Sequence, residues 1–246
     1  MIMKKDKDTN QQTPASEKMN ADYFLTGHSD YKKQIESIDT YKFISQALDN
    51  KLHGVDKLLD IGNGGIFDYS TENISEIFGL DLFLDSITDD VVVPDNVRMI
   101  QGSALDIPES LSNFDAVLMV MLIHHLVGKD VQSCVDNARR SFEEAYRVVK
   151  PGGRLLVMDS CVPAWFYAIE TRLFKAASWV IERTIKHPPV LQHTNSGIAE
   201  LMKNVGFGDI EIIIVPKGKY IVQFGVKVPS FITPTQPVLI IGHKNE

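Results

Sequence analysis

The sequence lacks the patterns that mark several common protein classes. Cys134 and Cys161 are the only cysteines in 246 residues and form no CxxC pair, so neither a metal-ligand pattern nor a disulfide framework is present. The longest apolar run, residues 116–123, is far too short to span a bilayer. The sequence has 25 Lys and Arg against 32 Asp and Glu, and this acidic balance disfavours binding to the phosphates of nucleic acid. We therefore expect a small-molecule partner, with no nucleic acid, metal or stable membrane insertion.

The first eighteen residues are polar and contain no hydrophobic signal region. This composition predicts a disordered tail over residues 1–18 and a cytoplasmic protein. The chain is 44% apolar, so residues 19–246 are long enough for one domain with a sizeable core.

Hydrophobic periodicity predicts the order of the secondary structure. Apolar residues recur every three or four positions over about residues 28–50, which indicates a helix. Short apolar strands then alternate with turns and helices, and Asp130 is placed to cap the helix that ends at KPGG (150–153). The strands are expected at residues 58–62, 76–81, 97–102, 116–122, 154–160, 209–216 and 236–244. This alternation predicts a parallel sheet with both faces covered.

A glycine loop follows the first predicted strand, in LLDIGNGG (58–65). Gly62 and Gly64 fit the start of a dinucleotide fingerprint, but Phe67 stands where the third glycine belongs. The Lys-Ser/Thr pair of a P-loop is absent. Asp60 would repel a pyrophosphate, whereas its carboxylate suits a ligand ammonium group.

The ends of the next two strands complete a site for adenosine. Asp81 lies 21 residues after Asp60, where an acid can accept hydrogen bonds from both hydroxyls of a ribose. The small residues of GSALDIP (102–108) allow a flat ring to lie against the backbone. Together these features indicate adenosine bearing an amino acid, without phosphate.

Five segments in this order resemble the class I S-adenosylmethionine-dependent methyltransferases, of the small-molecule, type 11-like kind: LLDIGNGG, GLDL, GSALDIP, FDAVLMVMLIHHL and VVKPGGRLLVMD. The resemblance covers about residues 55–160. It implies an α/β, Rossmann-like fold with a seven-stranded mostly parallel sheet, helices on both faces, an antiparallel last strand and a helical substrate lid. It also implies S-adenosyl-L-methionine as cofactor and S-adenosyl-L-homocysteine as product.

The resemblance assigns a role to each matching residue. The methionine part is expected at Asp60, Gly62, Asn63 and Gly64, the ribose at Asp81, and the adenine at Leu82, Ser103, Ala104 and Leu105, with Met119 where the fourth strand meets the cofactor. Two departures stand out. Serine at 103 replaces the acid of many relatives, and the short stretch before the second strand predicts that the first crossover helix is short or missing.

Candidates for acceptor chemistry lie on the same edge of the predicted sheet. His125 and His124 follow the fourth strand, where either can act as a base or merely pack the loop. An aromatic segment over about residues 162–192 is expected to form the lid, with a core or dimer helix and a membrane-surface helix as alternatives. The helix at about 28–50 is expected to cover the cofactor. The predicted acceptor contacts are Tyr23, Tyr31, Trp165, Phe166 and His193.

These features favour methyl transfer to oxygen or nitrogen of a small, mostly apolar or aromatic acceptor, in specialised metabolism. Carbon methylation of a lipid-like or quinone-like acceptor is the alternative within the same class. A scaffold that binds the cofactor without catalysis, and a nicotinamide enzyme, are alternatives of other classes. The acceptor's identity and the oligomeric state are left open.

Overall fold

A computed structural model describes residues 38–84, 92–184, 190–223 and 226–245. The predicted tail, the first part of the predicted N-terminal helix, Tyr23 and Tyr31 lie outside the described residues. The described part of that helix is α2, Asp39–Leu52.

The core of the fold is a seven-stranded sheet in the order β3-β2-β1-β4-β5-β9-β6. The first five strands in this order are parallel, and β9 runs antiparallel to both β5 and β6. The mostly parallel sheet with an antiparallel last strand is therefore confirmed. The strands are β1 Lys57–Ile61, β2 Glu76–Asp81, β3 Val97–Gln101, β4 Phe114–Val120, β5 Val149–Cys161, β6 Gly208–Ile214 and β9 Gln236–His243.

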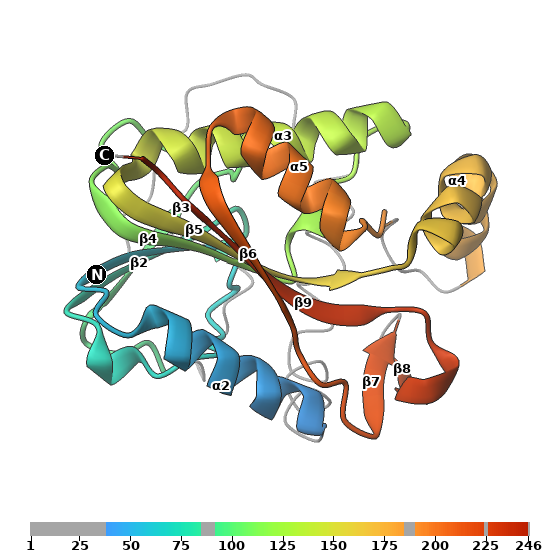
Figure 1. The fold of residues 1–246 in the computed structure, drawn as a ribbon, viewed down its shortest axis with the longest axis horizontal. Helices are drawn as coiled ribbons and strands as arrows, with labels where there is room; N and C mark the ends of the chain where they lie inside the picture. Colours follow the sequence, from blue (N-terminus) through green and yellow to red (C-terminus); the bar gives the residue numbers. More distant parts are fainter. Residues whose placement is uncertain (1–37, 85–91, 185–189, 224–225, 246) are drawn as a thin grey trace.

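Helices cover both faces of the sheet (Figure 1). One face packs against α2, and the other against α3, Val131–Val148, and α5, Asn195–Val205. Because successive side chains of a strand point to opposite faces, β4 contributes to both hydrophobic clusters. Val117 and Met119 belong to the cluster that includes α3 and α5, whereas Ala116 and Leu118 belong to the cluster that includes α2.

The ends of α3 and α5 follow local hydrogen-bonding chemistry. The Asp130 carboxylate accepts a hydrogen bond from the Ser133 amide, and the Ser133 hydroxyl is bonded back to Asp130, which closes a capping box. This confirms the predicted cap. Thr194 caps α5 through the Gly197 amide, and Gly206 ends that helix at a φ of 120°.

The connection between β1 and β2 contains a single turn of 3₁₀-helix, η1, Thr71–Asn73. The prediction that the first crossover helix is short or missing is confirmed. The segment is tied to α2, because Asp49 accepts hydrogen bonds from the amide and the hydroxyl of Ser70.

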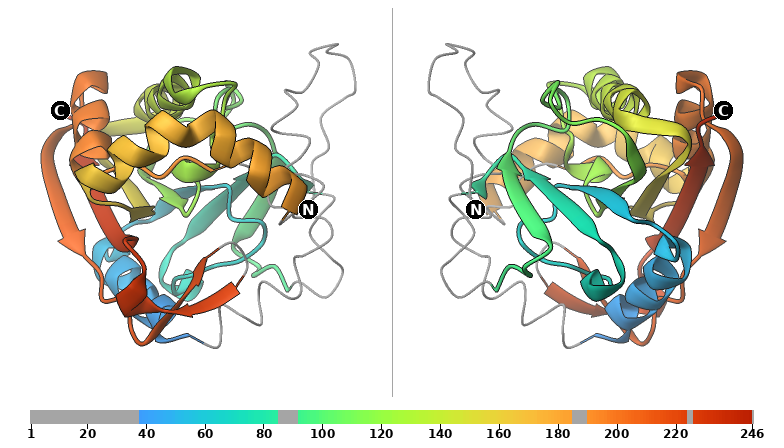
Figure 2. Two further views of the ribbon diagram at one scale, coloured as in Figure 1. Left: turned by 90° about the vertical axis from the view of Figure 1, so that its right-hand side faces the viewer. Right: turned by 90° about the vertical axis from the view of Figure 1, so that its left-hand side faces the viewer.

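Two further elements flank the carboxyl ends of β4 and β5. Helix α4, Ala164–Thr184, follows β5 directly, and a hairpin of β7, Tyr220–Gln223, and β8, Val226–Pro229, precedes the turn η4, Ser230–Ile232. The left view of Figure 2 looks onto this edge, with α4 above the strand ends and the hairpin below them.

Candidate cofactor and acceptor site

The glycine loop turns sharply at the carboxyl end of β1. Gly62, Gly64 and Gly65 have φ values of 76°, 56° and 80°, a left-handed conformation that glycine adopts without steric cost. The Gly62 amide donates to the Leu80 carbonyl at 2.7 Å, which holds the loop against the end of β2. A Cβ at Gly62 would lie 2.7 Å from Cδ1 of Leu122, so the segment after β4 packs directly on this loop.

Asp60 is a buried carboxyl group with one unsatisfied oxygen. Its Oδ2 accepts hydrogen bonds from the Asn63 amide group and the Tyr69 hydroxyl, both at 2.9 Å. Its Oδ1 is buried and has no hydrogen-bond partner among the described residues. Burial raises the pKa of Asp60 to about 7, against the lowering effect of these two hydrogen bonds. A ligand cation beside Oδ1 would complete its hydrogen bonding and favour the ionised form of Asp60.

Asp81 joins the glycine loop to the segment after β2. Its Oδ2 accepts a hydrogen bond from the Gly64 amide at 2.9 Å, and its Oδ1 accepts one from the Phe83 amide at 2.8 Å. The side chain lies at the end of β2, one strand away from Asp60. Asp81 therefore shapes the loop in addition to standing where a ribose acid is expected.

The expected adenine side lies beyond the carboxyl end of β3, beside β2. The Ser103 hydroxyl accepts a hydrogen bond from the Leu105 amide at 3.1 Å, so it stabilises the turn that carries Ala104. Leu82 is half-buried, and its carbonyl accepts a hydrogen bond from the Gln101 side chain. Met119 differs from these residues, because its side chain is fully buried in the sheet core.

The two predicted histidines form the turn η3, Ile123–His125, after β4. Nδ1 of His124 lies 2.5 Å from Oδ1 of Asp159 near the end of β5, and the rings of His124 and His125 have centroids 4.2 Å apart. Asp159 is the residue that the sequence reasoning missed. Its signal was the acid of VMDS, two residues before the end of β5, beside the end of β4 in a parallel sheet.

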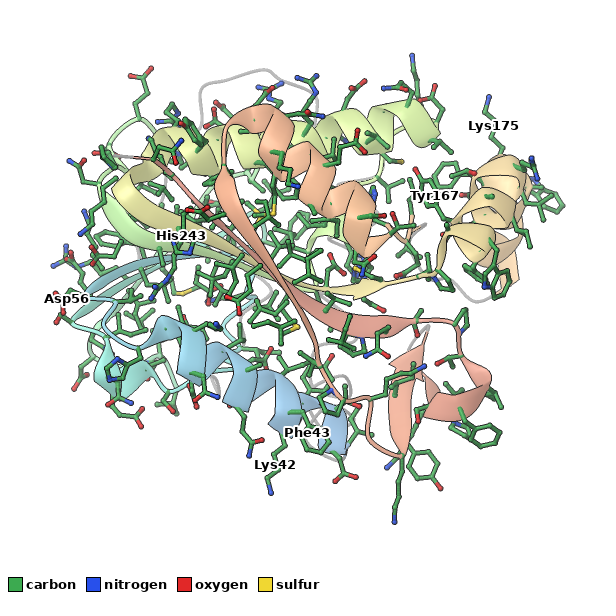
Figure 3. All side chains as sticks on the ribbon, in the orientation of Figure 1. Lys42, Phe43, Asp56, Tyr167, Lys175 and His243 are labelled. Atoms are coloured by element: carbon green, nitrogen blue, oxygen red, sulfur yellow. The ribbon has the colours of Figure 1, made fainter. Side chains whose placement is uncertain are left out.

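The remaining predicted acceptor residues differ in their burial and in the direction in which they face. His193 is buried, pairs through its backbone with Cys161, and has a pKa lowered by burial. Trp165 lies on the outside of α4 and is 62% exposed, with its ring edge-on to Phe166. Figure 3 shows Tyr167 on the side of α4 that faces the body of the protein and Lys175 pointing away from it. The structure thus gathers His124, His125 and His193, but not Trp165.

Within the described residues, His, Cys, Asp and Glu side chains form no group of three or more with the geometry to hold a metal ion. Cys134 and Cys161 are buried free thiols. None of the described helices combines the length and the apolar character needed to cross a membrane.

Comparison with known proteins gives the site its context. A family model described as a methyltransferase domain matches residues 59–157. Demethylmenaquinone methyltransferase of Listeria welshimeri is 27% identical over 149 residues, which cover 54% of this chain and 57% of that protein. The chain thus aligns with little more than half the length of this relative.

Solved structures share the fold across most of the chain. One is the complex between the Haloferax volcanii Trm112 methyltransferase activator and a putative methyltransferase. The match has a TM-score of 0.61 at 14% identity and covers 91% of this chain and 96% of that one. Another is human N-acetylserotonin methyltransferase in complex with S-adenosylmethionine, with a TM-score of 0.57, 15% identity, and coverage of 92% and 57%.

The family match runs from within β1 to within β5 and includes Asp60, Asp81 and His124. The strand order and the antiparallel β9 extend the same architecture over the rest of the sheet. Residues 59–157 therefore match a methyltransferase domain, and the sheet shares the fold of solved methyltransferases, one of them in complex with S-adenosylmethionine.

Proposed function

We propose that the protein transfers a methyl group from S-adenosylmethionine to oxygen or nitrogen of a small, mostly apolar or aromatic acceptor, in specialised metabolism. The observation that carries the proposal is the buried Asp60 carboxyl beside the glycine loop, whose Oδ1 has no partner in the part of the chain that the structure describes. An unpaired buried carboxylate is unfavourable by itself, whereas a cationic ligand at this place would complete its hydrogen bonding.

Different residues around the loop would bind different parts of the cofactor. Asp60, Gly62, Asn63 and Gly64 would hold the amino-acid end, and Asp81 the ribose. Leu82 and the turn Ser103–Leu105 would flank the adenine. The cofactor supplies a methyl group that its positive sulfur already activates. The protein's part is to hold donor and acceptor in line and to exclude water from between them.

The elements at the carboxyl edge would provide the acceptor side. Helix α4 would serve as the predicted lid, on which Phe166 and Tyr167 are half-buried and Trp165 is exposed. The hairpin β7–β8 would close the opposite side. Tyr23 and Tyr31 remain predicted acceptor contacts of the N-terminal segment.

Calorimetric titration of the full chain with S-adenosylhomocysteine tests the cofactor assignment, with NAD as the control. We expect micromolar binding of the first ligand and none of the second. Absence of binding to S-adenosylhomocysteine would refute the proposal. Binding without turnover of any acceptor in a broad mass-shift panel would instead favour a non-catalytic scaffold.

Carbon methylation of a quinone-like acceptor is the second candidate. The observation in its favour is the similarity to demethylmenaquinone methyltransferases, at 27% identity or less. A naphthohydroquinone in the acceptor panel separates the two candidates. NMR of the product distinguishes a methyl group on ring carbon from a methyl ether.

A further inference from the structure

His124 and Asp159 form a carboxylate–imidazole pair at the carboxyl edge of the sheet. Oδ1 of Asp159 lies 2.5 Å from Nδ1 of His124, and Oδ2 accepts a hydrogen bond from the His124 amide at 3.3 Å. The Ser160 amide also donates to Oδ1, at 2.6 Å. Burial by itself raises the pKa of Asp159, but His124 and these donors hold that pKa below its ordinary value. The carboxylate is therefore ionised and accepts the proton on Nδ1.

This pairing determines which nitrogen of His124 is available. A neutral imidazole that donates through Nδ1 carries its lone pair on Nε2. Within the part of the chain that the structure describes, Nε2 of His124 has no hydrogen-bond partner. The side chain of His124 is 12% exposed and that of Asp159 is 3% exposed, so the carboxylate is buried behind the ring.

The pair lies next to the glycine loop. Leu122, two residues before His124, has Cδ1 only 2.7 Å from where a Cβ of Gly62 would be. Met119 of β4 is in register with Ile61 of β1 on one side and Val157 of β5 on the other. His124 thus follows β4, the strand next to β1, and Asp159 lies near the carboxyl end of β5, the strand on the other side of β4.

Other ionisable groups surround His124 from each neighbouring element. His125 stacks beside it on η3, and His193, on the segment before α5, faces Asp159. Glu170 of α4 interacts electrostatically with His124, and burial raises the pKa of this carboxyl to about 7. Cys161 of β5 has its pKa raised by burial and by Asp159. Asp159 is the one of these groups that bonds directly to the His124 ring.

We propose that His124 is the general base of the reaction, oriented by Asp159, and that the acceptor carries an acidic hydroxyl group such as a phenol or an enol. This inference rests on the proposed function and narrows it to oxygen. Nε2 of His124 takes the hydroxyl proton while the oxygen's electron pair forms a bond to the methyl carbon. The carbon–sulfur bond breaks and its electron pair stays on sulfur. The products are a methyl ether, S-adenosylhomocysteine and an imidazolium ion, which returns its proton to solvent.

The pair suits this class of acceptor for a chemical reason. A neutral amine carries its own lone pair and needs no base. An alkyl alcohol is far too weak an acid for an imidazole, whose ordinary pKa is about 6.5. A phenol, with a pKa of about 10, as in tyrosine, is close enough for proton transfer to assist the reaction.

The first test uses the unsubstituted full chain labelled with ¹⁵N-histidine and saturated with S-adenosylhomocysteine. We expect the His124 ring to carry its proton on Nδ1 at pH 8, with Nε2 unprotonated. The spectrum of His124→Gln assigns the signal. A proton on Nε2 in the neutral ring would overturn the proposal.

The second test follows kcat/KM with a series of phenols of falling pKa, ending in a nitrophenol that is already ionised at pH 8. His124→Gln should lose roughly 10²–10⁴-fold with the least acidic phenol and little with the nitrophenol. Asp159→Asn, a positioning change, should lose about 10–100-fold and shift the pH profile of kcat/KM. His243→Gln is the matched control and should leave the rates unchanged. His243 of β9 lies opposite Arg154 in the strand pairing with β5, far from the carboxyl end of β5.

Three results would contradict this proposal while leaving the methyltransferase assignment intact. One is an equal loss across the whole phenol series for His124→Gln, which would indicate a structural role. Another is a loss that follows His125→Gln instead of His124→Gln. The third is a chain that binds S-adenosylhomocysteine and methylates amines or carbon but no phenol. Failure to bind S-adenosylhomocysteine would refute the proposed function itself.

Discussion

The buried carboxyl of Asp60 makes the stability of the protein depend on pH in a specific way. Its folded pKa of about 7 lies above the ordinary value of 3.8. Between these two values the folded state binds more protons than the unfolded state, so stability falls as pH rises toward 7 and then levels off. Asp60→Asn removes the charge with little change of shape, and the variant is therefore expected to lack this dependence.

The size of the effect follows from the pKa. From pH 5 to a pH above 7, wild-type Asp60 loses its proton over about two pKa units, and each unit corresponds to about 1.4 kcal/mol. The difference in unfolding free energy between Asp60→Asn and wild type should therefore grow by about 3 kcal/mol from pH 5 to pH 8. Groups that do not interact with Asp60 titrate equally in both proteins, so their contribution cancels in this comparison.

Urea denaturation of the ligand-free protein at pH 5 and pH 8 measures the difference. Asp60→Asn should be the more stable protein at pH 8. A difference that is equal at the two pH values would refute the reasoning that Asp60 is protonated in the folded state. Added S-adenosylhomocysteine should reverse the order at pH 8, because its ammonium group needs the carboxylate. A charge-assisted bond of about 1.5–3 kcal/mol implies roughly ten- to a hundredfold weaker binding to the variant.

Three further predictions concern other parts of the structure. Asp81→Ala should weaken S-adenosylhomocysteine binding by about ten- to a hundredfold in calorimetry. Asp81→Asn should weaken it less, because the amide keeps one of the two acceptors used by Gly64 and Phe83. Equal affinities for wild type and Asp81→Ala would mean that the ribose acid lies elsewhere. Gly62→Ala should lose roughly 1–2 kcal/mol of stability because its φ is 76°, and it should also lose ligand affinity because the new Cβ would contact Leu122. Gly54→Ala is the control: Gly54 has the same φ but no described atom within 4 Å of its Cβ, so this variant should lose stability alone. Asp130→Ala should lower the urea midpoint of unfolding, and Asp130→Ser should restore most of the loss, since serine also caps a helix.

The sequence predicted the elements whose signals are local. The strand before the glycine loop, the Asp130 cap and the short connection after the loop are each determined by a few neighbouring residues, and all three are confirmed. The alternation of strands and helices was enough to predict the parallel sheet, since parallel strands need crossover connections.

The contact between His124 and Asp159 could not be predicted from such local signals. The two residues are 35 positions apart, and their contact depends on the register in which β4 and β5 pair. The orientation of α4 was equally hidden, because its aromatic residues are spread around the helix and periodicity alone did not separate the exposed Trp165 from the buried Phe174. Both features are set by tertiary packing.

The single 3₁₀ turn between β1 and β2 affects the electrostatic potential in which a ligand lies. A full helix beginning behind a glycine loop would direct the positive end of its dipole at the ligand. In this protein η1 is too short for that effect, and Tyr69 and Ser70 tie the segment in place instead. The negative potential of Asp60 and Asp81 is then not offset by the dipole of a helix beginning behind the loop. We expect such a site to hold the positively charged sulfonium of the methyl donor more tightly than the neutral thioether left after transfer, which would favour release of the spent cofactor.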